Sequence, residues 1–376
     1  MSRTTVKLSA RDYNRAISPD KLNAQAQRTN NKNLIINGGM QVWQRETTAT
    51  AQTDGAYKTV DRFFGWLSGG GAYTTERSTG HLDTTGHENA LKVDVTTADT
   101  SIAASDYYAI AHKIEAQNLQ SLQYGSSSAK TITLSFWIKA TKTGTHTLFV
   151  SKNDSTQYIY VAEYTVSASN TWEHKTITIE PDNNIKAGAG AIVNDNGAGF
   201  TIGWILKYGS NNDGTANAWQ TGKYTTSNQV NNMDSTSNTW FLTGVQMEIG
   251  DKATDFEHEL YEATLHKCQR YYTRWQANTA YDGFAPGYWL VTTQFYGLYE
   301  LPVQMRQEPT LAIGGNFVIH SNGADTTAGS LIVNRATPLN VQTYSDQSSN
   351  TGTAGYAGGY RTNNDNDAYV EFKAEL

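Results

Sequence analysis

The sequence contains only one cysteine, Cys268, in 376 residues, so no disulfide can form within the chain. Cys268 lies in a helical pattern away from any catalytic motif, and we expect it to be a small buried apolar group. Long apolar runs are missing too, because no window approaches the roughly 18 apolar residues of a membrane span. The start of the chain also lacks the apolar segment of a signal peptide. We therefore expect synthesis in the cytoplasm without membrane insertion.

Charge is scarce as well. Charged residues make up 17% of the chain, the net charge is −6, and no run of Lys and Arg occurs. Because phosphate binding needs a basic face, no nucleic-acid partner is expected. Thr, Asn, Ser and Gly are abundant instead, which favours β-structure with polar turns over a helical bundle.

The chain is longer than a typical single domain, which predicts two domains and a short appendage. The appendage is residues 1–32, where Ser9 and Ser18 can cap two short helices. Helices this short are marginal in water, so we expect them to order against a partner or to act as a tether.

From Asn33 to about Gly250 the hydrophobic period changes to two. Alternating or apolar segments of strand length recur between polar turns, and no helical pattern separates them. Such strands predict an antiparallel sandwich, with a jelly roll over residues 33–254 as the expected arrangement. The segments are TITLSFWIK (131–139), HTLFVSK (146–152), YIYVAEYTV (158–166), WEHKTITIE (172–180), GFTIGWIL (199–206) and WFLTGVQMEI (240–249).

Residues 255–278 interrupt this pattern. Apolar residues recur there every three or four positions as far as Trp275, and Asp255 can cap the start, which predicts one linking helix. Residues 279–376 return to strand-like segments and predict a smaller C-terminal β-sandwich, with long loops at 321–330 and 345–367. The predicted fold class is therefore all-β, with a short helical appendage, a jelly roll, a linking helix and a smaller sandwich.

Several motifs resemble those of bacteriophage and prophage tail proteins that carry a carbohydrate-binding-module-like domain. They are NLIINGGMQVWQR (33–45), VDRFFGW (60–66), LSFWIKA (134–140), TGVQMEIGDKATDFEHELYEATLHKCQRYY (243–272), and a C-terminal acidic residue followed by leucine. The similarity covers residues 33–376, and its opening stretch resembles the first strand of carbohydrate-binding jelly rolls. The resemblance implies a homotrimeric tail fibre or spike that binds host surface polysaccharide.

One departure from this resemblance concerns metal binding. Gly39 stands where related modules often have an acidic residue that helps to hold a structural calcium ion. We therefore assign no metal or cofactor. If calcium were bound, Asp61 and Glu248 would be the acidic residues to hold it, together with backbone oxygens.

Catalytic constellations are weak. Five glutamates lie on strand-like segments, namely Glu115, Glu163, Glu173, Glu180 and Glu248, and we expect them to be solvated rather than paired for glycoside hydrolysis. The eight histidines lack metal-binding spacing, and no Gly-x-Ser-x-Gly motif is present. No enzymatic activity is expected.

Aromatic side chains point to binding instead, because a Tyr or Trp ring covers the C–H face of a sugar. Trp137 and Trp204 lie in apolar strands and are expected in the core. Other aromatics lie in Gly-rich and Asn-rich settings, and the loop at 351–367 is the predicted tip surface. The predicted glycan contacts are Tyr208, Trp219, Tyr356, Tyr360, Arg361 and Asn363.

The interpretation is a non-enzymatic virion fibre or spike. Residues 1–32 attach it to other tail or head proteins, with Tyr13, Ile17 and Leu22 as contacts, and the C-terminal domain faces the host. Two alternatives stay open: a head-decorating or tail-cementing structural protein, and a polysaccharide depolymerase.

Overall fold

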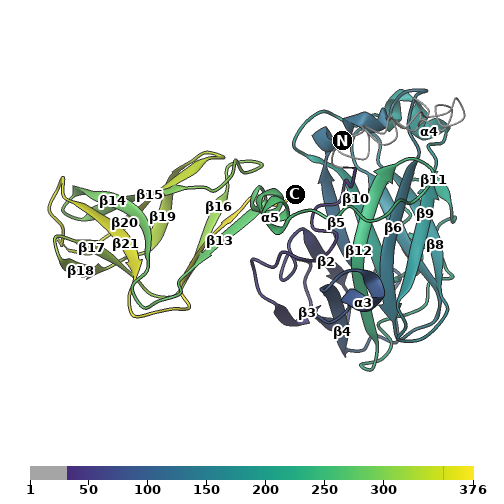
Figure 1. Cartoon of the computed structure of the whole chain (residues 1–376), viewed down its shortest axis with the longest axis horizontal. Helices are drawn as coiled ribbons and strands as arrows, with labels where there is room; N and C mark the ends of the chain where they lie inside the picture. Colours follow the sequence, from purple (N-terminus) through teal and green to yellow (C-terminus); the bar gives the residue numbers. More distant parts are fainter. Residues whose placement is uncertain (1–31, 350) are drawn as a thin grey trace, which may run out of the picture.

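The computed structural model describes residues 32–349 and 351–376 of the chain. Strands dominate it, which confirms the predicted all-β class. Figure 1 shows two β bodies joined near helix α5 (Tyr261–Gln269): a larger sandwich formed by the chain before α5, and an elongated smaller body formed by the chain after it. Among the described residues, every helix is too short or too polar to cross a membrane.

The sandwich consists of two six-stranded antiparallel sheets. The first contains, in spatial order, β1 (Thr48–Gln52), β3 (Ala72–Ser78), β4 (Ala90–Thr97), β12 (Thr239–Ile249), β6 (Ile132–Ala140) and β9 (Glu173–Ile179). The second contains β11 (Ala218–Gln220), β8 (Tyr158–Val166), β7 (Gly144–Lys152), β10 (Ala198–Tyr208), β5 (Tyr107–Glu115) and β2 (Phe63–Ser68). Short helices lie in the connections: α3 (Leu82–Thr85), α4 (Asn183–Lys186), and the 3₁₀ helices η1 (Ala116–Leu122), η2 (Gly188–Gly190) and η3 (Ser210–Asn212).

Apolar residues of the alternating segments fill the space between the two sheets. Phe136, Trp204 and Trp240 are almost fully buried there, as expected for Trp204. Trp137 points the other way from Phe136 and is half-buried, because successive side chains of a strand face opposite sides of the sheet. The expectation that Trp137 lies in the core is therefore wrong.

The opening stretch 33–45 is not a strand, which corrects the sequence prediction. Asn37 adopts a left-handed backbone, with φ of 61°, and the chain turns there. Its buried side chain accepts hydrogen bonds from the N–H groups of Gln41 and Val42. Gly38 must be glycine, because a Cβ at this position would lie 1.9 Å from the carbonyl oxygen of Val245. The apolar residues of this stretch therefore anchor a tight turn over β12.

Helix α5 is shorter than the predicted helix. It begins after Leu260 rather than at Asp255, and the chain pairs as a strand from Tyr272 onward. The helical spacing of apolar residues continues as far as Trp275, which is why the predicted helix is too long. Trp275 lies in a strand and packs against the core of the smaller body. Cys268 is buried as expected, and burial raises the pKa of its thiol well above the usual range.

The smaller body contains a three-stranded and a seven-stranded antiparallel sheet. The three-stranded sheet has the order β13 (Tyr272–Gln276), β22 (Tyr369–Lys373) and β16 (Thr310–Gly314). The seven-stranded sheet has the order β18 (Ala324–Thr327), β17 (Phe317–Ser321), β21 (Ala357–Thr362), β14 (Gly283–Val291), β15 (Gln294–Glu300), β20 (Asn340–Asp346) and β19 (Leu331–Ala336). The long loops predicted at 321–330 and 345–367 are therefore partly strands, β18 and β21.

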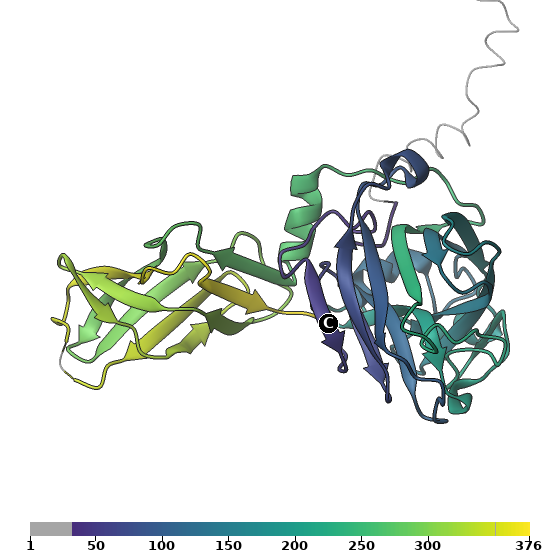
Figure 2. The same cartoon turned by 90° about the horizontal axis from the view of Figure 1, so that it is seen from below.

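The chain ends where the two bodies meet, as Figure 2 shows. Glu375 accepts hydrogen bonds there from Arg45, at 2.8 Å, and from Arg62. Arg45 and Arg62 lie in turn over the rings of Tyr272 and Tyr271, at 3.6 and 3.5 Å from the ring centroids. Four of the five motifs that resemble tail proteins thus meet at this junction, whereas LSFWIKA lies in β6 of the sandwich.

Candidate functional site

The candidate site lies on the outer face of the seven-stranded sheet, which is the face turned away from the buried side chains of the smaller body. The strand register aligns Tyr288, Tyr296 and Tyr344 across β14, β15 and β20, with Ala357 and Ile332 at either end of the line. Adjacent ring centroids are 6.1 and 5.7 Å apart, and the rings are nearly parallel. We call Tyr288, Tyr296 and Tyr344 the tyrosine row.

Strand alternation places these rings outside. Trp289, Phe295 and Tyr299, which alternate with them, are buried in the core of the smaller body. Tyr288 is 44% exposed, and its neighbours Leu290 and Leu298 are 47% and 40% exposed. A run of exposed large apolar side chains on one face is unusual for a protein surface that contacts only water.

A groove of about 660 Å³ adjoins the tyrosine row and is lined by residues of β14, β17 and β21. Its floor includes Gly359, where the three atoms nearest to an added Cβ all belong to the backbone of Ala285 and Pro286. One wall contains Pro286, next to the tyrosine row, and the other contains His320 and Arg361. We call this groove the trough.

Three polar side chains form a hydrogen-bonded group at the trough wall. Asp325 lies between Arg361, with 2.5 Å from Nη2 to Oδ2, and His320, with 2.8 Å from Nδ1 to Oδ1. The hydrogen bond from Arg361 lowers the pKa of the Asp325 carboxyl, so this group is ionised at neutral pH. The guanidinium also lies 5.0 Å from the centroid of the Tyr281 ring.

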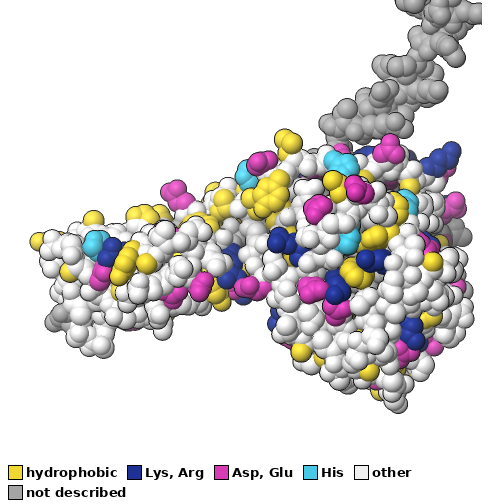
Figure 3. Space-filling model, turned by 60° about the horizontal axis from the view of Figure 1, so that its bottom comes forward, with side chains coloured by type: hydrophobic (Ala, Val, Ile, Leu, Met, Phe, Trp, Pro, Cys, Tyr) yellow, Lys and Arg dark blue, Asp and Glu magenta, His cyan; other side chains and the backbone are white. Residues whose placement is uncertain are grey.

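Figure 3 shows a histidine, a basic, an acidic and a hydrophobic side chain together near the far end of the smaller body. His320 is the only histidine of the sequence after α5. The outer face therefore combines exposed rings with hydroxyl, amide, guanidinium and carboxylate groups. This combination can cover an apolar surface and also exchange hydrogen bonds with a hydroxyl-rich molecule.

Of the predicted glycan contacts in the smaller body, Arg361 lies at the trough. Tyr356 is 47% exposed in the turn before β21, and Asn363 is exposed in the turn after it. Tyr360 lines the trough only from beneath, because it is 1% exposed and its hydroxyl donates to the carbonyl of Phe295 in the core. The expectation that Tyr360 projects from a loop is therefore wrong.

The other two predicted contacts belong to the sandwich and are also buried. Tyr208 ends β10, is 4% exposed and packs against Tyr107 and Tyr224. Trp219 lies in β11, is 6% exposed and donates its indole N–H to the carbonyl of Glu180. Trp219 lines a separate groove of about 490 Å³, so the six predicted residues do not form one site.

The sequence prediction missed the tyrosine row, His320 and Asp325. A partial signal for the row was present, because the segment YWLVTTQFYGLYE (288–300) has strand-forming residues on both sides of two threonines, with a tyrosine within each half. The pairing of His320 with Asp325 follows from the hairpin of β17 and β18, which the sequence prediction treated partly as a loop.

The glutamates on the strands differ in their exposure to solvent, although all five were expected to be solvated. Glu163 contacts Thr226 and Asn228, and Glu173 pairs with Lys175. Glu115, however, is fully buried beside Arg270, with 2.8 Å from Oε1 to Nε. Although burial opposes it, hydrogen bonding to Arg270 lowers the pKa of Glu115. Its role at the junction is thus structural, and the expectation of a solvated side chain is wrong.

The two acidic residues considered for calcium belong to separate hydrogen-bond networks. Asp61 is buried and accepts hydrogen bonds from Gln44 and Arg45. Glu248, also buried, accepts from Gln246 and Thr254. The described residues contain no cluster of three or more His, Cys, Asp or Glu side chains arranged to hold a metal ion.

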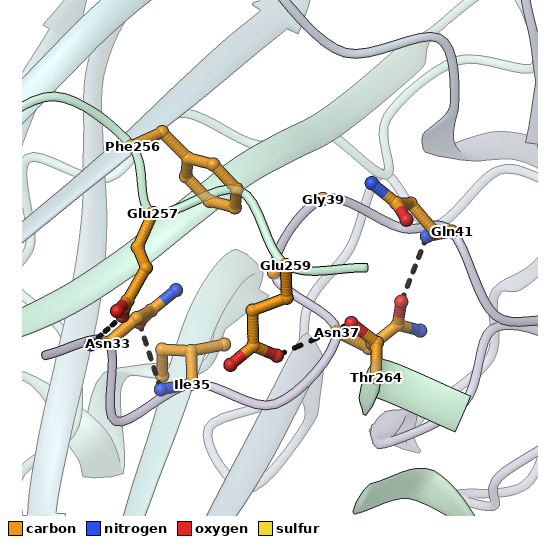
Figure 4. Close-up of a pocket in the computed structure, with 10 residues that line it drawn as sticks. Asn33, Ile35, Asn37, Gly39, Gln41, Phe256, Glu257, Glu259 and Thr264 are labelled. Atoms are coloured by element: carbon orange, nitrogen blue, oxygen red, sulfur yellow. Dashed lines mark hydrogen bonds between the residues drawn. The ribbon is translucent and has the colours of Figure 1, made fainter. Parts of the chain in front are cut away.

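A small pocket at the opening stretch holds two further carboxylates, as Figure 4 shows. Glu257 accepts a hydrogen bond from the N–H of Asn33, and Glu259 accepts one from Thr264. The pocket has a volume of only about 20 Å³, so it has room for little more than a water molecule. These contacts attach the start of the sandwich to the segment before α5. The predicted anchoring residues Tyr13, Ile17 and Leu22 lie outside the described residues.

No family model and no curated protein matches the chain. Among solved structures, a Bacteroides thetaiotaomicron protein assigned as sugar binding has 11% identity and a TM-score of 0.31, over 58% of this chain and 100% of that one. A family 11 carbohydrate-binding module from Clostridium thermocellum has 13% identity and a TM-score of 0.28, over 55% and 98%. Tailspike protein 4 of bacteriophage CBA120 has 8% identity and a TM-score of 0.29, over 58% and 22%. Likenesses this distant decide neither the ligand nor the activity of this chain.

Proposed function

We propose that this chain is a non-enzymatic fibre or spike of a phage virion that recognises host surface glycans through the outer face of its smaller body. The observation that carries the proposal is the tyrosine row beside the trough. Sugars present C–H faces ringed by hydroxyl groups, and this face offers rings for the former and polar partners for the latter. Its place in the fold supports the same role, since the seven-stranded sheet lies away from the sandwich (Figure 1).

Attachment and assembly form the second part of the proposal. Residues 1–32 join the chain to other tail or head proteins of the virion, and three copies assemble. Val291, Val333 and Leu339 are exposed apolar side chains of the smaller body outside the tyrosine row, which supports contacts between copies in this region. Three-fold repetition also turns weak glycan contacts into useful avidity.

The glycan role is tested by binding the purified chain to an array of bacterial polysaccharides. Truncating two rings of the row, as Tyr288→Ala with Tyr296→Ala, is expected to weaken binding about tenfold for each ring, since one ring contributes about 1.4 kcal/mol. The matched control is Tyr261→Ala, because Tyr261 is 50% exposed on α5 at the other end of the smaller body. Equal binding by the double variant and the control would remove the row from the glycan site.

The anchoring role is tested by deleting residues 1–31. The shortened chain should remain a soluble oligomer and should bind polysaccharide as before, but should no longer join particles. Normal incorporation of the shortened chain into particles would show that attachment lies elsewhere. Release of reducing ends from a bound polysaccharide would instead favour a depolymerase.

A further inference from the structure

We infer that the trough selects neutral glycan residues with neighbouring free hydroxyl groups, and that it discriminates against uronic acids and other anionic sugars. The inference rests on the proposed function and names the class of ligand that the outer face takes. It follows from how the charges of that face are arranged.

The only cation at the trough wall is already neutralised. Arg361 Nη2 lies 2.5 Å from Asp325, and His320 shares the same carboxylate at 2.8 Å. An anionic sugar would have to displace Asp325 from Arg361 and leave that carboxylate without its ion pair. Such a displacement is unfavourable in free energy, because the carboxylates of Asp325 and of the sugar would then compete for one guanidinium.

The rest of the outer face adds no cation near the trough. The strand register places Glu300 and Asp346 on the same side as the tyrosine row, at opposite ends of the β15–β20 pair. The remaining basic side chain, Arg335, is on β19, and three strands separate β19 from β21. At about 4.8 Å per strand, the strand of Arg335 lies roughly 19 Å from β21 and roughly 14 Å from β14, the nearer side of the trough. The carboxylates of this face thus outnumber its arginines, which repels polyanions.

The same group suits a neutral sugar. Two adjacent hydroxyls can donate to Asp325 and accept from Arg361 without separating the pair, because both groups keep unused hydrogen-bonding capacity. The side-chain-free floor at Gly359 lets a ring approach the sheet closely. The uncharged amides Gln342 and Asn334, bonded to each other at 2.8 Å on β20 and β19, extend a neutral polar surface beyond the row.

The test compares wild type with Asp325→Asn on neutral and anionic probes: a galactan, a mannan and a dextran on one side, and polygalacturonate on the other. Wild type should bind at least one neutral probe, with an affinity that changes little between about 50 and 500 mM salt. Asp325→Asn leaves Arg361 without its counter-ion and should lose roughly tenfold on the neutral probe while gaining binding to polygalacturonate. Asp346→Asn is the matched control, because it removes a carboxylate from the same face but not from the trough.

The outcomes separate the inference from the proposed function. Salt-sensitive binding of wild type to polygalacturonate alone would overturn the inference and leave glycan recognition standing. Neutral binding that changes equally in Asp325→Asn and Asp346→Asn would overturn the assignment to the trough. Binding to no polysaccharide would overturn both. A thermal melt of each variant confirms folding, which is expected because Asp325 is one-third exposed.

Discussion

Replacing Glu375 by glutamine should destabilise the junction between the two bodies. The carboxylate of Glu375 is the ion-pair partner of Arg62, whose side chain is fully buried, and it also pairs with Arg45. Arg45 would keep Asp61 as a partner, whereas Arg62 would keep the carbonyl of Lys113 and the rings of Tyr57 and Tyr271 but no carboxylate. The variant therefore leaves one buried guanidinium without a counter-ion.

The size of the effect follows from that one charge. Breaking a buried pair by removing one partner costs 3–5 kcal/mol in general, and we expect about 3 kcal/mol here because glutamine still offers one acceptor oxygen. For bodies of this size each kcal/mol lowers the melting temperature by about 2–4 °C, so Tm should fall by roughly 6–12 °C.

Differential scanning calorimetry measures this directly, and limited proteolysis of the segment before α5 reports whether the junction opens. Glu262→Gln is the control, because Glu262 is exposed on the nearby helix α5. If Glu375→Gln melts within about 1 °C of wild type, Arg62 does not depend on the ion pair and the reasoning fails.

Three further predictions concern the sandwich. Burial raises the pKa of Asp61 to about 6, so ionisation of this carboxyl opposes folding. The free energy of unfolding of wild type, relative to that of Asp61→Asn, should therefore fall by about 3 kcal/mol as the pH rises from 4 to 6. Denaturant melts at each pH measure this difference. Gly38→Ala should place a methyl group against the carbonyl of Val245 and destabilise the opening turn by about 2 kcal/mol or more in urea unfolding; an unchanged midpoint would contradict this. Lys152→Met should leave the carbonyl oxygens of Asp154 and Ala189 without their buried donor and lower Tm by several degrees, with Lys142→Met as the surface control.

Periodicity predicted six of the twelve strands of the sandwich, namely β6 to β10 and β12, because successive side chains of a strand face opposite sides of the sheet. Alternation alone does not say which of two neighbouring residues faces the core. Tyr360 and Arg361 are neighbours on β21, so one must point into the core and the other outward, and the sequence GGYR does not say which. In the structure Tyr360 is the residue that faces the core. It pairs in register with Ile319, and both side chains are buried.

The opening stretch and the buried aromatics failed for a different reason. Asn37 stops a strand from forming by bonding four backbone groups at once, and these partners include Asp61, 24 residues away. Tyr208 and Trp219 border polar, Gly-rich segments, yet those segments fold back over the sheet and cover both rings. Contacts between distant segments decide both cases, and local pattern carries no information about them.

The smaller body is held at one end only. β13 leads the chain into it and β22 leads it out, and these two strands are hydrogen-bonded neighbours. A force on the far sheet would therefore act on both strands at once. Through β13 it would reach the sandwich along the backbone at Tyr271 and Tyr272. Through β22 it would reach the sandwich by the ion pairs of Glu375 with Arg45 and Arg62. A force applied to the smaller body would be divided between the covalent backbone and these ion pairs. The ion pairs would separate first.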